Sequence, residues 1–412
     1  MRVPSLIKRN TALFALSQSF TGTGMQFAYG LGPLMFIALT QSAHWAGLSV
    51  VLLGLSRFLV AYPVGKITDA YGRKPGILLG LVLAMVGGVM TGWSMNVQSV
   101  PLLVGGMLIF GMGMYANAQM RVAATDMFPP RLRGIALGYV MMGSTVGVLI
   151  SPLFVIAGES LAHRFGGDPL GAPWLLLPFI ILPGMLMISF VRPDPKEIGS
   201  NLERYYPEYT PPPASPGKRA ADFSARELLQ HIPSRLAIIA NGAAYGNMAI
   251  VMVFTSLVLQ HHGHSLGYIA FAHSLHAFGM FGLSIPVGKL ADRFGRGRVM
   301  YPGVALTLVG AFLTAFTDGY WSITFGSFLV GLGWSAANIA ATATIADFAL
   351  TAQRGRAIGV NDSVAGAVNV VVALVTGPMI QWLGLTAAGV AAVVFAALPL
   401  AMRFAYRPVK AS

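Results

Sequence analysis

Long apolar segments recur along most of this sequence, and they constrain its fold more than any other feature. A helix needs roughly 20 apolar residues to cross a bilayer, and in lipid its backbone polar groups must be satisfied internally. The sequence therefore predicts an all-α membrane protein with 12 transmembrane helices. The expected spans are 11–39, 44–64, 76–95, 99–121, 134–158, 172–191, 235–260, 266–287, 299–317, 320–346, 356–382 and 385–405.

The composition agrees with a chain surrounded by lipid. Charged residues make up 10% of the sequence, against about 25% in soluble domains. The 49 glycines favour closely packed helices in lipid. The net charge of +13 is not taken to indicate nucleic-acid binding. No cleavable signal peptide is expected, since MRVPSLIKRN runs straight into the first span.

The basic residues predict the orientation of the chain. All lysines and arginines except Arg57, Arg121 and Arg164 lie on the side of the spans that also holds both termini. Cytoplasmic loops are rich in lysine and arginine. We therefore expect a multi-pass protein with both termini in the cytoplasm.

A polar stretch divides the expected spans into two sets of six. Residues 192–234 are rich in proline, charge and tyrosine, which is typical of a linker. Within it, Ser224 and Glu227 have the spacing of a capping box before a short helix. The predicted domains are a six-helix bundle at 1–191, a cytoplasmic linker at 192–234 and a second six-helix bundle at 235–412.

The two halves repeat each other at two places. The first match aligns Gly65, Asp69, Gly72 and Arg73 with Gly288, Asp292, Gly295 and Arg296. The second aligns Asp126, Arg133, Gly134 and Gly138 with Asp347, Arg354, Gly355 and Gly359. Both matches lie at cytoplasmic ends of expected spans, and such internal repeats are typical of secondary transporters.

The first repeated pattern, G-x-x-x-D-x-x-G-R, resembles the signature loop of the major facilitator superfamily. The resemblance covers almost the whole chain and implies two pseudo-symmetric six-helix bundles that work by alternating access. It also implies a gating role for the residues of the first match in both halves. We expect their charges to hold the two bundles together on the cytoplasmic side. The alternative is that these are loop charges reaching toward water.

Two motifs in the seventh and eighth spans carry soft metal-binding groups. Met248 and Met252 are four residues apart, as are His276 and Met280, so each pair lies on one helix face. At about 1.5 Å per residue, both pairs lie roughly 12–22 Å below the outer surface. Thioether sulfur and imidazole nitrogen suit Cu(I) better than zinc, calcium or manganese.

These paired motifs also resemble a narrower group, the CcoA-like copper importers of the bacterial inner membrane. The resemblance implies that Met248, Met252, His276 and Met280 are copper ligands, and that the copper serves cytochrome c oxidase assembly. Copper is then a transported substrate, and no cofactor is expected. Cysteines are linked to function in that branch, and this chain has none. Two alternatives stay open. In one, the methionines only fill space in a packed core; in the other, His276 only joins two helices through a hydrogen bond.

Other polar residues are candidates for the transport path. His261, His262 and His264 lie at the outer junction of the two spans, with His273 below, and are a possible metal relay; an ordinary polar turn is the alternative. In the first half, Met25, Gln26, Arg57 and Asn117 are possible cavity-lining residues. A buried guanidinium at Arg57 would favour an anionic or amide-rich substrate over a metal ion.

Other function classes fit less well. No nucleophile and base set or carboxylate pair indicates an enzyme. An importer of a small organic solute such as riboflavin is the first alternative, because a sister group carries riboflavin. Proton-coupled efflux of drugs or metabolites is the second, although Gly143, Gly147 and Pro152 do not form the tight cluster usual in that class. The expected partners are the lipid bilayer and the substrate, with no nucleic acid and a monomeric state.

Overall fold

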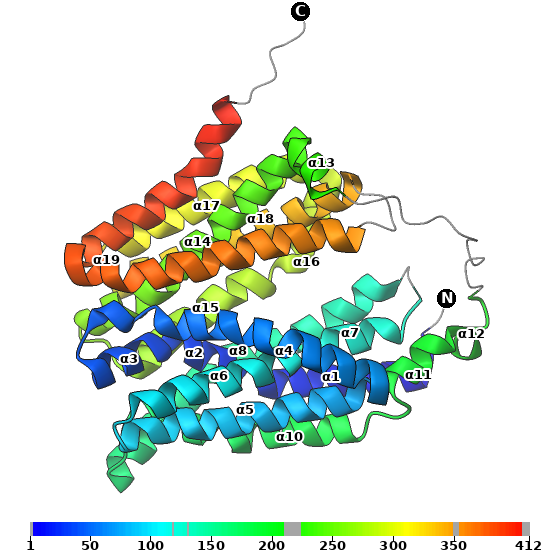
Figure 1. The fold of residues 1–412 in the computed structure, drawn as a ribbon, viewed down its shortest axis with the longest axis horizontal. Coiled ribbons are helices and arrows are strands. Elements are labelled where there is room, and N and C mark those ends of the chain that lie inside the picture. Colours follow the sequence, from blue (N-terminus) through cyan, green and yellow to red (C-terminus); the bar gives the residue numbers. More distant parts are fainter. Residues whose placement is uncertain (1–2, 118, 130–131, 210–223, 349–353, 406–412) are drawn as a thin grey trace, which may run out of the picture. The chain divides into compact units, whose positions relative to one another are not determined.

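The computed structural model describes residues 3–117, 119–129, 132–209, 224–348 and 354–405 (Figure 1). Every regular element in these ranges is a helix. The chain divides into two compact units. Unit 1 holds the first half together with Leu266–Ser274, and unit 2 holds the second half together with Ser42–Leu48. The predicted boundaries at 191 and 234 stay a prediction.

The first expected span consists of three consecutive helices in unit 1, and the residues between them, Gly22 and Leu31, keep right-handed helical dihedral angles. α1 ends at Thr21 and α2 at Gly30, in a stretch where glycines bring other helices very close. Thr23 Oγ1 donates to the backbone oxygen of Gly147 across one such contact, at 2.9 Å. The helices of unit 1 are α1 (Ser5–Thr21), α2 (Thr23–Gly30), α3 (Gly32–Thr40), α4 (Leu48–Tyr71), α5 (Arg73–Asn96), α6 (Val100–Asn117), α7 (Gln119–Asp126), α8 (Arg133–Phe165), α9 (Ala172–Leu175) and α10 (Leu177–Ser189).

The helices of unit 2 end in α19 (Arg354–Ala405), the longest helical stretch among the described residues. Gly384, with φ +82° and ψ 172°, interrupts the last one, so the two final spans expected from the sequence are its two arms. Only glycine adopts this conformation at little cost. The helices are α14 (Ile232–His261), α15 (Leu266–Phe281), α16 (Ser284–Phe294), α17 (Arg296–Phe316), α18 (Tyr320–Phe348) and α19 (Arg354–Ala405). The residues of α15 up to Ser274 belong to unit 1.

The described helices support a membrane protein. Nine helical stretches among the described residues are long and apolar enough to span a bilayer, and the last, Val360–Arg403, includes both arms of α19. The first two expected spans are not among the nine. The first is divided into α1–α3, and α4 includes positions whose side chains are not described, Gly65 and Asp69 among them.

The expected linker is partly folded. α11 (Pro195–Ser200) and α12 (Leu202–Tyr205) follow α10, and Tyr206 donates its hydroxyl to the backbone oxygen of Met127 at 3.2 Å. Burial raises the pKa of Tyr206 to about 12. Further along, the Ser224 side chain accepts from the backbone N–H of Glu227, which confirms the predicted start of α13 (Ala225–Gln230).

Candidate functional site

His276 is the most informative of the predicted metal ligands. It is fully buried on α15, and its Nδ1 lies 2.6 Å from the backbone oxygen of Ser327 on α18. A carbonyl oxygen only accepts, so Nδ1 carries the proton and Nε2 keeps its lone pair. Within the described part of the chain, Nε2 is buried and has no hydrogen-bond partner. The histidine thus presents a free nitrogen ligand.

The other three predicted ligands occupy neighbouring helices of unit 2. Met280 lies one turn beyond His276, partly buried against α18. Met248 and Met252 are 6% and 3% exposed on α14. The methionine pair shares its stripe of α14 with Tyr245, because positions three and seven residues apart lie on one helix face.

Trp334 of α18 links the two motifs. Its ring contacts Tyr245 edge-on at 5.1 Å and Phe281 at 6.3 Å between centroids. Tyr245 lies one turn before Met248, and Phe281 follows Met280 directly. The two motifs are therefore at a similar level of unit 2, and the methionine stripe of α14 is on its α18 side.

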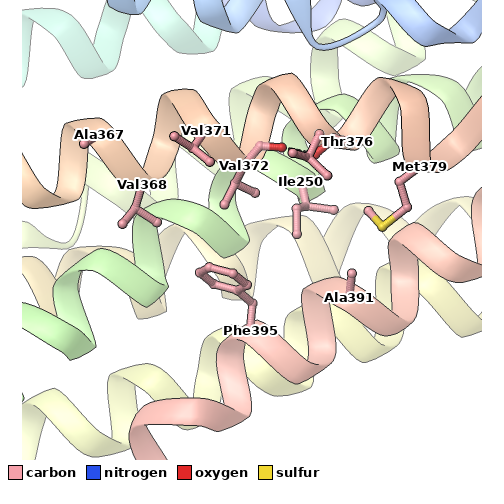
Figure 2. Close-up of a pocket in the computed structure, with 10 residues that line it drawn as sticks. Ile250, Ala367, Val368, Val371, Val372, Thr376, Met379, Ala391 and Phe395 are labelled. Carbon is pink, nitrogen blue, oxygen red and sulfur yellow. Dashed lines mark hydrogen bonds between the residues drawn. The ribbon is translucent and has the colours of Figure 1, made fainter.

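The opposite side of α14 faces a different, apolar pocket. Ile250 lines it together with residues from both arms of α19, including Val368 and Phe395 (Figure 2). The pocket has a volume of about 460 Å³. Its one hydroxyl, Thr376, already donates to the backbone oxygen of Val372 at 2.7 Å. An ion or a polar solute would find no free polar group there.

The histidines predicted as a metal relay are not arranged as a metal site in the described part of the chain. His262 Nε2 lies 3.9 Å from a carboxylate oxygen of Asp318, and the ring of His264 lies 5.1 Å from that of Tyr320. Across the described residues, no group of three histidine, aspartate or glutamate side chains is placed to hold a metal ion. His273 is fully buried and packs beside Gly30 within unit 1. Their role as a relay stays a prediction.

The candidate lining residues of the first half have varied surroundings. Asn117 is buried and donates from Nδ2 to Thr21 Oγ1 at 3.1 Å. Gln26 is buried as well, and its Oε1 has no partner in the described part of the chain, whereas Met25 is half-buried. Arg57 is one of these candidates, and its place in the cavity lining stays a prediction. That side chain is exposed, and its guanidinium lies 5.9 Å from the Tyr115 ring centroid, a distance compatible with a cation–π contact.

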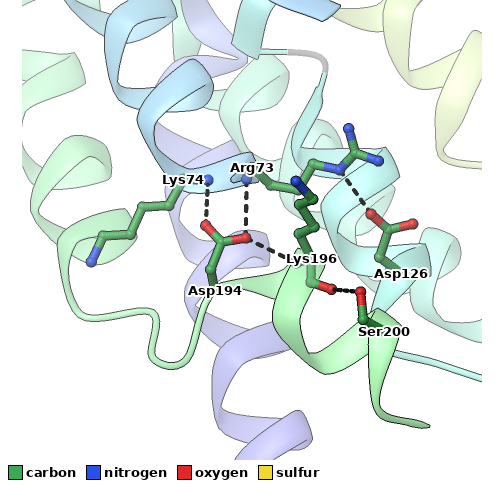
Figure 3. A network of polar contacts seen from close by, with 6 residues as sticks. All are labelled: Arg73, Lys74, Asp126, Asp194, Lys196 and Ser200. Atoms are coloured by element: carbon green, nitrogen blue, oxygen red, sulfur yellow. Dashed lines mark hydrogen bonds and ion pairs between the residues drawn. The ribbon is translucent and has the colours of Figure 1, made fainter. Parts of the chain in front are cut away.

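An ion pair joins the two repeated patterns within each half. Arg73 Nε lies 2.8 Å from Asp126 Oδ2 in unit 1, and Arg296 Nε lies 3.3 Å from Asp347 Oδ2 in unit 2 (Figure 3 shows the first). These arginine contacts are made inside one unit. The expected contact between the halves stays a prediction, and the structure does not describe the side chains of Asp69 and Asp292.

The glycines of the pattern have a clear backbone role. Gly72 and Gly295 have φ values of +99° and +96° and come directly before α5 and α17. Side chains other than glycine rarely adopt these values, so both glycines allow the sharp turn before the arginine. A Cβ added to Gly288 would meet no other atom within 4 Å.

Asp194 is a central residue of this region that the sequence did not indicate. Its carboxylate accepts from the backbone N–H groups of Arg73, Lys74 and Lys196 at 2.9–3.0 Å (Figure 3). It therefore caps two helices, α5 and α11, where a negative charge is favourable. Aspartate followed by Pro195 is a typical helix start and predicts the cap of α11. The contact with α5 spans 121 residues and has no local signal.

Replacing Arg73 with glutamine is expected to reduce transport several-fold while the protein still inserts in the membrane. The change removes a charge from a pair that is only 19% and 26% exposed. Arg296→Gln should have a milder effect, because its pair is longer and 30% and 61% exposed, and exposed pairs contribute little. Uptake per amount of protein in the membrane is the measurement. Wild-type uptake by Arg73→Gln would contradict a gating role.

Comparison with known proteins gives a consistent result. A family model described as Major Facilitator Superfamily matches residues 14–232 and 236–412. A transporter from Bacillus subtilis, YdeG, is 29% identical over 365 residues, covering 87% of this chain and 82% of its own. The riboflavin transporter RfnT of Brucella anthropi is 26% identical over 360 residues, covering 86% and 85%. A bacterial homologue of the human lysosomal transporter Spinster, solved facing inward and unoccupied, has a TM-score of 0.70 at 17% identity and covers 96% of both chains.

Proposed function

The chain belongs to the major facilitator superfamily and is a secondary transporter, and we propose that it imports copper as Cu(I) across the bacterial inner membrane. The proposed ligands are Met248, Met252, His276 and Met280. Both termini would lie in the cytoplasm, and the imported copper would serve cytochrome c oxidase assembly.

The free Nε2 of His276 carries this proposal. A metal-binding histidine commonly donates its second ring N–H to a backbone carbonyl, which fixes the ring and its tautomer. The contact between Nδ1 and the Ser327 oxygen has this form. A histidine that served only to join helices would leave a buried nitrogen unsatisfied, which is costly.

The methionines supply the second half of the donor set. Thioethers are soft, neutral ligands that favour Cu(I) over harder divalent ions. Because these ligands are neutral, they add no negative charge that would hold the cation more tightly. The bound ion can therefore be released again, as a carrier requires. The shared contact of Tyr245 and Phe281 with Trp334 supports the placement of both motifs at one level.

Import of a small organic solute such as riboflavin is the second candidate. It is favoured by the similarity to the riboflavin transporter of Brucella anthropi, which extends over 86% of this chain. The aromatic group of Tyr245, Phe281 and Trp334 would offer ring faces to a planar solute. Trp334 Nε1 is also buried and without an acceptor among the described residues.

Deletion of the gene in its host should lower cytochrome c oxidase activity, because the enzyme would lack copper. Adding copper to the medium should restore the activity through other uptake routes, and adding riboflavin should not. Oxidase activity in membranes, compared with the parent strain, is the measurement. Restoration by riboflavin alone would favour the second candidate.

A further inference from the structure

We propose that Gly279 and Gly331 are positioning residues for the copper ligands. Because they have no side chain, α15 and α18 come close enough for the Ser327 carbonyl to accept a hydrogen bond from His276 Nδ1, which leaves Nε2 free to bind the metal. This inference rests on the proposed function for its link to copper. The contact between the helices can be tested without copper.

Gly331 of α18 lies directly against the histidine. A Cβ added to Gly331 would collide with the backbone oxygen of His276, and it would come within 3.3 Å of Met280 Cγ. Both residues of the H-x-x-x-M motif therefore contact the same point of α18. Any side chain at Gly331 would push this motif away.

Gly279 makes the reciprocal contact from α15. A Cβ there would lie 2.6 Å from the backbone oxygen of Phe328 and 2.9 Å from the backbone nitrogen of Leu332. Real Cβ atoms are essentially never found this close to backbone atoms. Small residues on facing helices allow close backbone approach within membranes, so each helix contributes a glycine to one contact.

The close approach determines where the histidine proton is. Ser327 lies one turn before Gly331 on α18, and its backbone oxygen is 2.6 Å from His276 Nδ1. Its hydroxyl is a further 3.3 Å contact to the same nitrogen. If the helices move apart by the width of a methyl group, this hydrogen bond lengthens beyond a useful distance. The ring can then rotate or protonate Nε2 instead, and the metal loses an oriented ligand.

Gly333 provides a matched control on the same helix. A Cβ added there would collide with the backbone oxygen of Gly303 on α17 and lie 2.7 Å from Thr307. Gly333→Ala therefore adds a methyl group, as Gly331→Ala does, and causes a collision of similar severity on a different face of α18. It disturbs packing without pushing on the helix that carries His276.

The first test compares copper binding and uptake by Gly331→Ala, Gly279→Ala and Gly333→Ala. Loss of a contact that orients a metal ligand typically costs about 10–100-fold in affinity. We expect an increase of this size in the copper KM, and in the Kd from chelator competition, for the first two variants only. X-ray absorption of the Cu(I)-loaded variants should show loss of the nitrogen ligand with sulfur retained. The proposal would be overturned if Gly333→Ala raised the copper KM as much as the other two variants. It would also be overturned if Gly331→Ala and Gly279→Ala both kept the wild-type KM.

The second test uses the metal-free protein and is independent of transport. Nitrogen NMR of protein labelled on histidine, assigned with His276→Gln, reports which ring nitrogen carries the proton. The wild type should show Nδ1–H with a bare Nε2, and Gly331→Ala should show a mixture. If the protein neither binds nor carries copper yet shows this change, the proposed function fails and the positioning contact stands. Nε2–H in the wild type would overturn the contact itself.

Discussion

Copper uptake is expected to fall to background when Met248 and Met252 are both replaced with leucine. Leucine has nearly the same volume, so the change should cost less than about 1.5 kcal/mol if these residues only fill space. As ligands, both would lose the sulfur that binds Cu(I), and the ion would keep only His276 and Met280. Initial rates of radioactive copper uptake at equal protein abundance are the measurement.

The matched control for this experiment is a pair of buried methionines elsewhere in the chain. Met107 on α6 and Met300 on α17 are 0% and 3% exposed, so leucine at both sites tests core packing alone. That control variant should keep at least most of its uptake. Normal uptake by Met248→Leu with Met252→Leu would rule out the methionine pair as ligands.

Replacing His276 with glutamine is expected to have a comparably large effect. Glutamine can still donate its amide to the Ser327 carbonyl, but an amide oxygen is a hard ligand and a poor match for Cu(I). His276→Met restores a soft donor and should recover part of the uptake. The measurements are uptake and melting temperature together. A folded His276→Gln protein with full uptake would show that the histidine only joins α15 to α18.

The fold was largely predictable because its signals are local or repeated. The apolar spans, the repeated glycine and arginine pattern and the capping serine at 224 each depend on residues close together in sequence. The break between the last two spans also has a local cause, since Gly384 adopts a positive φ. The close contacts of the first span could not be predicted, because they join it to residues far away in the chain, such as Gly147.

The candidate ligands were proposed from the sequence, whereas the contacts that surround them could not be predicted from it. The spacing of Met248, Met252, His276 and Met280 is visible in the sequence. The carbonyl that fixes His276 is 51 residues away, and a backbone acceptor has no residue type to recognise. Asp126 and Arg73 both stood in repeated patterns, yet only the fold shows that they pair.

Uptake of radioactive copper and radioactive riboflavin, measured side by side in vesicles containing the purified protein, tests the proposed substrate most directly. Copper should be kept reduced, and empty vesicles provide the background. A copper importer will accumulate copper in a saturable way, lose this activity in Met248→Leu with Met252→Leu, and leave riboflavin at background. Saturable riboflavin uptake without copper uptake would contradict the proposed function.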